Sequence, residues 1–111
     1  MNIVVLQGVL SRTPDRRELA SGSVLLQFDL TTPTSTGAAS VPVAWFDPPP
    51  SAQFDVGDEV VVTGEVRRRF FRSGGATQTR TEVVAGLVQR ASNRKGVART
   101  LGRLRESLAG P

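Results

Sequence analysis

A length of 111 residues suits one compact domain, and the absence of cysteine and histidine excludes disulfides, thiolate or imidazole metal sites, and catalysis by either side chain. The net charge of +4 is unevenly distributed, because three arginines oppose eight acidic residues in 1–66 whereas eleven basic residues oppose two acidic ones in 67–111. This separation favours a polyanionic partner for the second half over a basic surface that only aids solubility.

The dominant hydrophobic period is two, which predicts a series of short strands. The first spans residues 2–10, and its inner face is expected to carry Val4, Leu6, Gly8 and Leu10. A glycine inside a strand indicates a bulge or a sharp bend. The second strand spans residues 24–31, with alternate apolar residues on its inner face: Val24, Leu26, Phe28 and Leu30.

Residues 32–40, which are mostly small, are expected to form a loop after the second strand. Three more strands are then predicted: residues 41–46, 59–72 and 80–88. In the third strand, alternation places Trp45 in the core and Phe46 on the exposed face, where it either stacks on a base or contacts a partner. A Ser-Gly-Gly turn joins the last two strands as a hairpin. Strands of this length without a strong helix between them predict an all-β barrel or sandwich.

The C-terminal segment, residues 93–109, has a different period. Its apolar residues recur at spacings of four, three and four, and so predict one face of a helix: Val97, Leu101, Leu104 and Leu108. Gly96, Gly102 and basic residues in the first turn weaken this helix. We therefore expect a marginal helix that is ordered when its leucines contact a partner or a sister subunit, with a frayed basic terminus as the alternative.

The stretch VRRRFFRSGG in the fourth strand places two phenylalanines among four arginines. Strict alternation continues the inward row through Arg68 and Phe70, so that Phe70 caps the end of the barrel. Phe71 then stands on the solvent side beside Arg67 and Arg69. Exposed aromatic rings among arginines are typical of surfaces that bind single strands, because bases stack on the rings and phosphates contact the cations. The alternatives are a subunit interface, a place in the core, and a one-residue slip that exchanges Phe70 and Phe71.

No arrangement of residues predicts an active site. The acidic residues lie mostly in turns, where aspartate is favoured by local hydrogen bonding. The adjacent pair Asp58 and Glu59 enters a strand, whose successive side chains point to opposite faces. No glycine-rich phosphate loop precedes a helix. The sequence therefore predicts a protein that is not an enzyme and that uses no cofactor and no metal.

Four segments have a recognisable order: MNIVVLQGVLSRTPDRR, SGSVLLQFDLTT, VPVAWFD and FDVGDEVVVTGEVRRRFFRSGGATQTRTEVVA. Together they resemble the bacterial single-stranded DNA-binding protein family, whose members have the OB fold. The resemblance covers about residues 1–90. It implies that residues 1–90 are a single-strand-binding domain, built as a five-stranded OB-fold barrel with a long hairpin between the fourth and fifth strands. Residues 91–111 would be a basic tail or short helix.

The resemblance also implies binding of single-stranded DNA without strong sequence preference, as a homo-oligomer that is a dimer or a tetramer. Phe71 falls at a stacking Trp of the family's fourth strand, and Phe46 falls at a stacking Phe of its third. With the arginines, the residues expected to bind nucleic acid are Phe46, Arg67, Arg69, Phe71, Arg72, Arg80, Arg12 and Arg17. The residues expected to contact a partner or sister subunit are Val97, Leu101, Leu104 and Leu108.

The chain departs from the family pattern at several places: the loop of residues 32–40 lacks the family's aromatic residue, and Pro48-Pro49-Pro50 with a few residues replaces the helix usually found before the fourth strand. Ser40 stands where the family has a Trp, and the sequence ends in LRESLAGP where the family has an acidic, Phe-terminated tip. An accessory role in DNA replication, repair or recombination, without recruitment of repair enzymes, is therefore expected. The alternatives are an adaptor that resembles the primosomal OB protein and acts through protein contacts, and an RNA-binding OB module. Without a membrane-spanning run or a signal-peptide pattern, the expected location is the cytoplasm, in association with the nucleoid.

Overall fold

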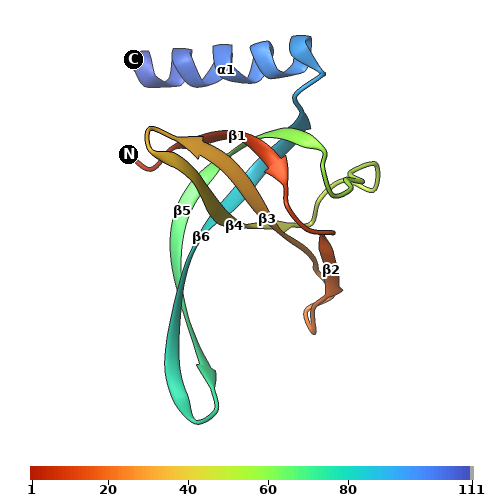
Figure 1. Cartoon of the computed structure of the whole chain (residues 1–111), viewed down its shortest axis with the longest axis vertical. Coiled ribbons are helices and arrows are strands. Elements are labelled where there is room, and N and C mark those ends of the chain that lie inside the picture. Colours follow the sequence, from red (N-terminus) through yellow and green to blue (C-terminus); the bar gives the residue numbers. More distant parts are fainter. Residues whose placement is uncertain (111) are drawn as a thin grey trace.

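Six strands and one helix make up the computed structural model, which describes residues 1–110 (Figure 1). The strands are β1 (Val4–Leu10), β2 (Asp15–Glu18), β3 (Val24–Thr34), β4 (Gly37–Phe46), β5 (Glu59–Ser73) and β6 (Ala76–Arg90). The helix is α1 (Arg94–Ala109). The sheet order is β1-β5-β6-β4-β3-β2, and an additional pairing of β1 with β3 closes it. Five strands thus form the OB-fold barrel that the sequence predicts, with β2 added outside it.

The barrel interior is filled by the alternate residues that the sequence assigned to the inner faces. The largest fully buried side chains are Leu10, Leu30, Val43, Val60 and Val62. Trp45 is buried as predicted, and its ring centroid lies 6.4 Å from that of the half-buried Phe54. Since each CH₂ removed from water contributes about 0.8 kcal/mol, this aliphatic interior is the main source of stability.

Two glycines lie where strands of the barrel approach each other most closely. A Cβ atom on Gly8 would lie 2.3 Å from the carbonyl oxygen of Thr31, and one on Gly64 would lie 2.1 Å from the carbonyl oxygen of Val84. The β5–β6 register is irregular at Thr63 and Gly64, where β6 contains one extra residue, Gly86. Gly8 therefore allows the close approach of β1 to β3, and the irregularity in strand pairing lies between β5 and β6 and not at Gly8.

One sequence-based prediction about the strands was wrong, and one short strand was not predicted. Residues 32–40 are not a loop, because β3 extends to Thr34 and β4 begins at Gly37, with paired residues from Thr31↔Ser40 to Thr34↔Gly37. Runs of Thr, Pro and Ala look like a loop, but here they are the exposed end of a hairpin. The short strand β2 was missed because Asp15–Glu18 is fully exposed and carries no apolar alternation. Its backbone pairing with β3, from Asp15↔Gln27 to Glu18↔Val24, has no hydrophobic signature.

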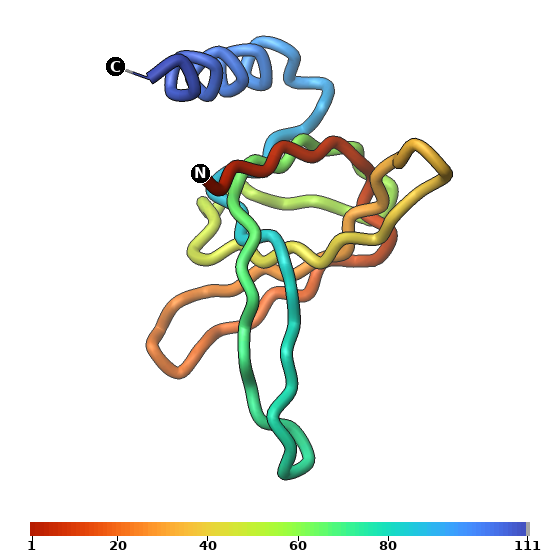
Figure 2. The backbone as a smooth tube through the Cα atoms, turned by 90° about the vertical axis from the view of Figure 1, so that its left-hand side faces the viewer, coloured from red at the N-terminus to blue at the C-terminus, as the bar shows by residue number. Residues whose placement is uncertain are grey.

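Strands β5 and β6 continue beyond the barrel as a two-stranded arm, which comprises residues 66–82 (Figures 1 and 2). The pairing of β1 with β5 ends at Val4↔Gly64, and the Asn2 side chain then makes two hydrogen bonds with the Val66 backbone, at 2.8 and 2.9 Å. Beyond this point, β5 pairs only with β6 among residues 1–110. The prediction that Phe70 caps the barrel was wrong, since Phe70 lies on the arm and is 66% exposed.

The helix α1 lies across the barrel beside β1, on the side opposite the arm (Figures 1 and 2). The Asn93 side chain caps its first turn by accepting a hydrogen bond from the Gly96 amide at 3.2 Å. The Thr100 hydroxyl donates to Gln89 of β6 at 2.9 Å, so the first half of the helix is anchored to the barrel. Leu101 and Leu108 remain 41% and 51% exposed. Within residues 1–110, no helix is long and apolar enough to cross a membrane.

Replacement of Gly64 by Ala tests the close approach of β5 to β6. The new methyl group would meet backbone atoms, which cannot rotate away, so Gly64→Ala is expected to lower the free energy of unfolding by about 2 kcal/mol or more. Gly86→Ala is the matched control, because the nearest atom to its Cβ would be the Thr63 carbonyl oxygen at 3.7 Å. Urea unfolding of both variants measures the difference. Equal stability of the two variants would contradict this reading of the strand crossing.

Candidate nucleic-acid interface

The front face of the arm carries three of the six arginines predicted to bind nucleic acid. It is defined by the side chains of Arg67, Arg69 and Phe71 on β5 and of Gln78, Arg80 and Glu82 on β6. The register places Arg69 opposite Arg80 and Phe71 opposite Gln78, and directly opposed residues of antiparallel strands point to the same face. The Arg69 guanidinium carbon lies 5.7 Å from the centroid of the Phe71 ring, which is consistent with a shared face.

Strands β2, β3 and β4 contribute a row of three side chains to the same side of the molecule. Cross-strand pairing aligns Arg17 of β2 with Leu25 of β3, and Leu25 with Phe46 of β4. Leu25 is only 4% exposed although it points away from the barrel core, whereas Phe46 is 41% exposed. The β3–β4 pairing therefore holds an exposed aromatic ring at the end of β4, on the same face as Arg17 of the edge strand.

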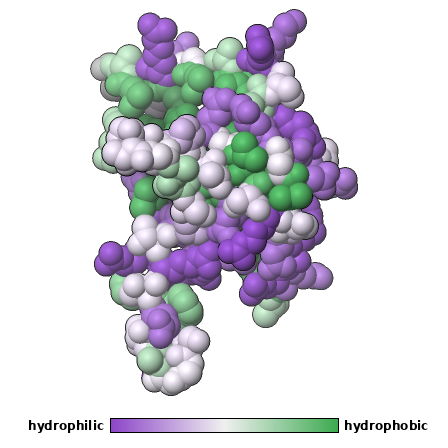
Figure 3. Space-filling model, in the orientation of Figure 1, coloured by the Kyte–Doolittle hydropathy of each residue, from purple (hydrophilic) through white to green (hydrophobic). Residues whose placement is uncertain are grey.

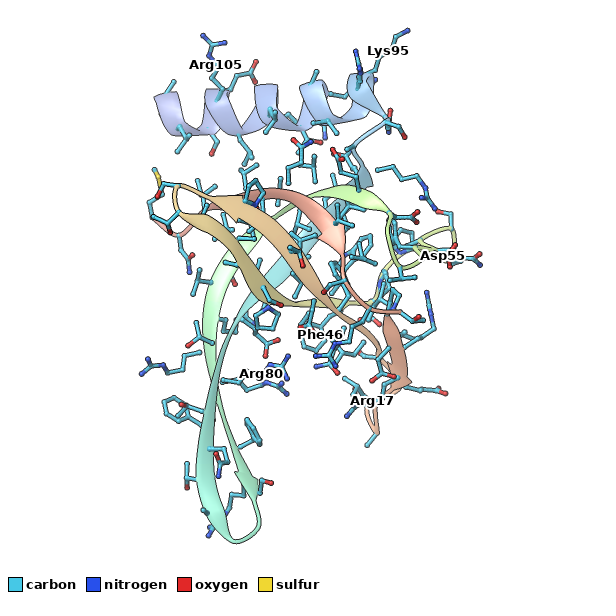
Figure 4. All side chains as sticks on the ribbon, viewed as in Figure 1. Arg17, Phe46, Asp55, Arg80, Lys95 and Arg105 are labelled. Atoms are coloured by element: carbon cyan, nitrogen blue, oxygen red, sulfur yellow. The ribbon has the colours of Figure 1, made fainter. Side chains whose placement is uncertain are left out.

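A hollow separates this row from the arm, and arginines reach it from both sides. Figure 4 shows Arg80 extending from the arm toward the side of the barrel where Phe46 and Arg17 lie. In Figure 3, the surface is indented between the arm and the part of the barrel that carries β2. A cavity of about 150 Å³ in this region is lined by Arg12, Thr13, Asp15, Gln27, Phe28, Asp29 and Arg80. The fold thus brings together Arg12 and Arg80, which lie in distant parts of the sequence.

Most of these arginines form ion pairs with acidic residues of the same surface. Arg12 lies 3.1 Å from Asp29, Arg17 lies 3.3 Å from Asp15, and Arg67 pairs with Glu65. Such exposed pairs contribute only about 0–1 kcal/mol each. A phosphate group can therefore replace the carboxylate at a low energetic cost. Arg80 forms no ion pair with any residue of the described chain.

Glu82 is the one acidic residue of the arm, and it is buried. Its side chain is 5% exposed and accepts a hydrogen bond from Arg69 Nε at 3.0 Å. This contact holds the Arg69 guanidinium near the face of the Phe71 ring, where a cation is favoured by the ring quadrupole. The Glu82 charge also offsets part of the positive charge of the front face.

The structure separates Arg72 from the other predicted arginines. Arg72 is opposite Thr77 in the register and so shares a face with Phe70, not with Phe71. Its guanidinium donates to the Gly75 carbonyl oxygen at 3.3 Å. Sequence reasoning also missed Leu25 and Glu82 as parts of this surface. The alternation of β3 could have identified Leu25, but nothing local to Glu82 marks it as a partner of Arg69, thirteen residues away.

A larger cavity of about 510 Å³ lies near the start of α1, and its lining combines acidic and basic residues, including Asp58, Glu59, Arg90 and Arg94. Arg90 Nη1 donates to Asp58 Oδ2 at 2.8 Å, and the Asp55 amide donates to the same carboxylate at 2.9 Å. The Asp55 amide and then Arg90 lower the pKa of Asp58 below its usual value of 3.8. Asp58 therefore stays ionised near neutral pH and cannot act as a general acid there. Residues 1–110 contain no cluster of three or more His, Cys, Asp or Glu side chains able to hold a metal.

No family model and no curated protein sequence matches the chain. Among solved structures, the chain is similar to the dimeric N-terminal domain of the PriB protein from Thermoanaerobacter tencongensis. The match has a TM-score of 0.65 and 18% sequence identity, and it covers 80% of this chain and 94% of that one. At this identity the similarity concerns the fold, and it agrees with the five-stranded OB barrel described above.

Proposed function

We propose that the chain is a non-catalytic OB-fold module that binds single-stranded nucleic acid, with DNA as the expected ligand, along the front face. The observation that carries this proposal is the arrangement of two aromatic rings, Phe46 and Phe71, each about two-fifths exposed, with arginines on both sides of the hollow. Exposed rings beside cations offer a flat apolar contact for bases and positive charge for phosphates.

The energetics favour a ligand that has both flat rings and negative charge. Stacking of a base on an aromatic side chain contributes about 1–3 kcal/mol, and it tolerates any base because every base has a π face. Phosphate contacts add affinity that falls with salt, because binding releases counterions from the strand. Binding is therefore expected to tolerate sequence changes and to weaken steeply as the salt concentration rises.

Replacement of the two rings tests the stacking contacts. Phe46→Ala and Phe71→Ala should each weaken binding of oligothymidylate by about 1–3 kcal/mol, because each variant removes one stacking contact. Fluorescence anisotropy of a labelled strand measures the affinity. Val56→Ala is the control, because Val56 is also apolar and exposed but lies in the segment between β4 and β5, away from the front face.

Unchanged binding by Phe71→Ala would remove that ring from the site. The same titration with oligouridylate distinguishes the two kinds of strand. Tighter binding of oligouridylate than of oligothymidylate would favour the RNA-binding alternative over a DNA-binding module.

Replacement of the buried Glu82 tests the electrostatic part of the proposal. In Glu82→Gln the amide keeps the shape of the side chain but removes its charge, so that Arg69 is no longer neutralised. The variant is expected to bind oligothymidylate more tightly at low salt. The slope of log affinity against log salt concentration should become more negative by about one, which corresponds to one additional phosphate contact. Glu106→Gln on α1 is the control for the change in net charge. Equal or weaker binding by Glu82→Gln, with an unchanged melting temperature, would show that Arg69 does not contact the phosphates.

A second proposed role is assembly of the chain through its apolar face on the side of α1. Leu101 and Leu108 of the helix, together with Val5 and Val9 of β1, are between 38% and 51% exposed. The similar PriB domain is dimeric, which supports a homodimer as the first expectation for this chain. If this face serves mainly in protein contacts, the chain acts as an adaptor that resembles the primosomal OB protein, which is the alternative given in the sequence analysis.

Polar replacement of the helix leucines separates assembly from strand binding. The double variant Leu101→Ser/Leu108→Ser should weaken self-association by about tenfold or more, because burial of these side chains contributes about 1.5–3 kcal/mol each. Analytical ultracentrifugation measures the association, with Glu106→Gln as control, because helical spacing places the exposed Glu106 on the opposite side of α1 from both leucines. Unchanged self-association would exclude the leucines from the interface, whereas loss of assembly with intact strand binding would support the adaptor role.

A further inference from the structure

The arm has a second face, which the front-face site leaves unused. This reverse face is defined by the side chains of Val66, Arg68, Phe70 and Arg72 on β5 and of Thr77, Thr79 and Thr81 on β6. The register supports the grouping, because Arg68 is opposite Thr81 and Phe70 is opposite Thr79. Both faces of one ribbon therefore carry a phenylalanine and arginines.

The aromatic ring of the reverse face is more accessible than its counterpart. Phe70 is 66% exposed, whereas Phe71 is 40% exposed and has the Arg69 guanidinium near its ring. An uncovered phenylalanine forgoes most of the free energy that its burial would supply. Phe70 is thus the aromatic side chain of the arm with the most apolar area left to cover.

The arginines of the reverse face also have fewer acidic partners than those of the front face. On the front face, Arg67 and Arg69 pair with Glu65 and Glu82. Within residues 1–110, neither Arg68 nor Arg72 forms an ion pair. The side chains that define the reverse face include no acid, so its positive charge is not neutralised locally.

The charge pattern decides which occupant fits this face. A second copy of the chain that used the same patch on both subunits would bring Arg68 and Arg72 toward their own equivalents, which like-charge repulsion opposes. An acidic peptide would pair with the arginines, but it does not have a flat ring at every residue that could stack on Phe70. A single strand of nucleic acid carries negative phosphates and flat bases in alternation, and it matches both features.

We propose that the reverse face of the arm binds a second segment of the same single strand, so that the arm lies between two segments of one bound molecule. This inference rests on the proposed function of the front face. A strand that follows the front face can pass around the turn between β5 and β6 and return along the other side. The arm is only one ribbon thick, and both of its long edges beyond the barrel lack a partner strand in the described chain.

Two lengths of oligothymidylate test this proposal. A strand of about six nucleotides can occupy one face only, whereas a strand of about thirty exceeds the range of about 4–16 nucleotides that one OB fold covers. Phe70→Ala should weaken binding of the long strand by about five- to a hundredfold and change binding of the short strand by less than about twofold. Phe71→Ala, as the comparison, should weaken binding of both lengths.

Three further variants distinguish stacking and charge from general apolar contact. Phe70→Leu keeps the apolar surface but not the flat ring, so it should behave like Phe70→Ala, whereas Phe70→Trp should bind the long strand at least as well as the unmodified chain. Arg68→Gln should reduce the logarithmic salt slope for the long strand by about one. Arg105→Gln on α1 is the control, because Arg105 points away from the barrel (Figure 4).

The outcomes separate this inference from the function on which it rests. If Phe70→Ala binds both lengths as the unmodified chain does while Phe71→Ala binds both more weakly, the reverse face is not a binding face but the proposed function stands. If Phe70→Ala weakens binding of the short and the long strand equally, both rings contact the same segment of the strand, and the two-segment arrangement is overturned. A change in self-association without a change in affinity would assign Phe70 to a second copy. No binding of either length by the unmodified chain would overturn both proposals.

Discussion

The site depends on one constraint, which is that β5 and β6 are longer than the barrel that they help to close. The barrel offers β5 a partner in β1 only as far as Gly64, and it offers β6 a parallel partner in β4 only at Val83 and Val84. Beyond these points the two strands have only each other, so their period-two alternation exposes side chains on both faces. Because neither face of this stretch has to pack into the core, it can consist of arginines and phenylalanines.

The barrel and the arm have complementary parts in the proposed interface. The barrel fixes Phe46 beside Leu25 and Arg17 through strand pairing, and a rigid core lies beneath these residues. The arm carries Phe71 and Arg80 to the other side of a hollow that the barrel alone does not have. Carboxylates pair with most of the front-face arginines in the free chain. These pairs hold the guanidinium groups in place. The exposed Arg67–Glu65 pair is weak and can be exchanged for a phosphate contact, whereas the Glu82 carboxylate that pairs with Arg69 is buried.

The fold was largely accessible from the sequence, because apolar alternation identified all five barrel strands and the spacing of leucines identified α1. The site could be predicted from the sequence only in part. The two rows of β5 were assigned correctly by alternation, yet Phe70 was placed at the barrel end because the sequence does not show where a strand loses its neighbours. The partner of Arg69, Glu82, could not be found either, since their contact depends on the register of the hairpin. The short strand β2 has no hydrophobic signal, so only the backbone shows that Arg17 lies beside β3.

Nuclear magnetic resonance of the chain, titrated with a short oligothymidylate, tests the central claim most directly, because amide chemical shifts report every part of the surface at once. We expect the shifted amides to cluster around Phe46, Phe71, Arg80 and Arg12, on the two sides of the hollow. The amides of α1 and of the exposed side of β1 should remain unshifted. Shifts confined to α1 and β1, with the arm and the end of β4 unaffected, would contradict the claim that the single strand lies between the arm and the barrel.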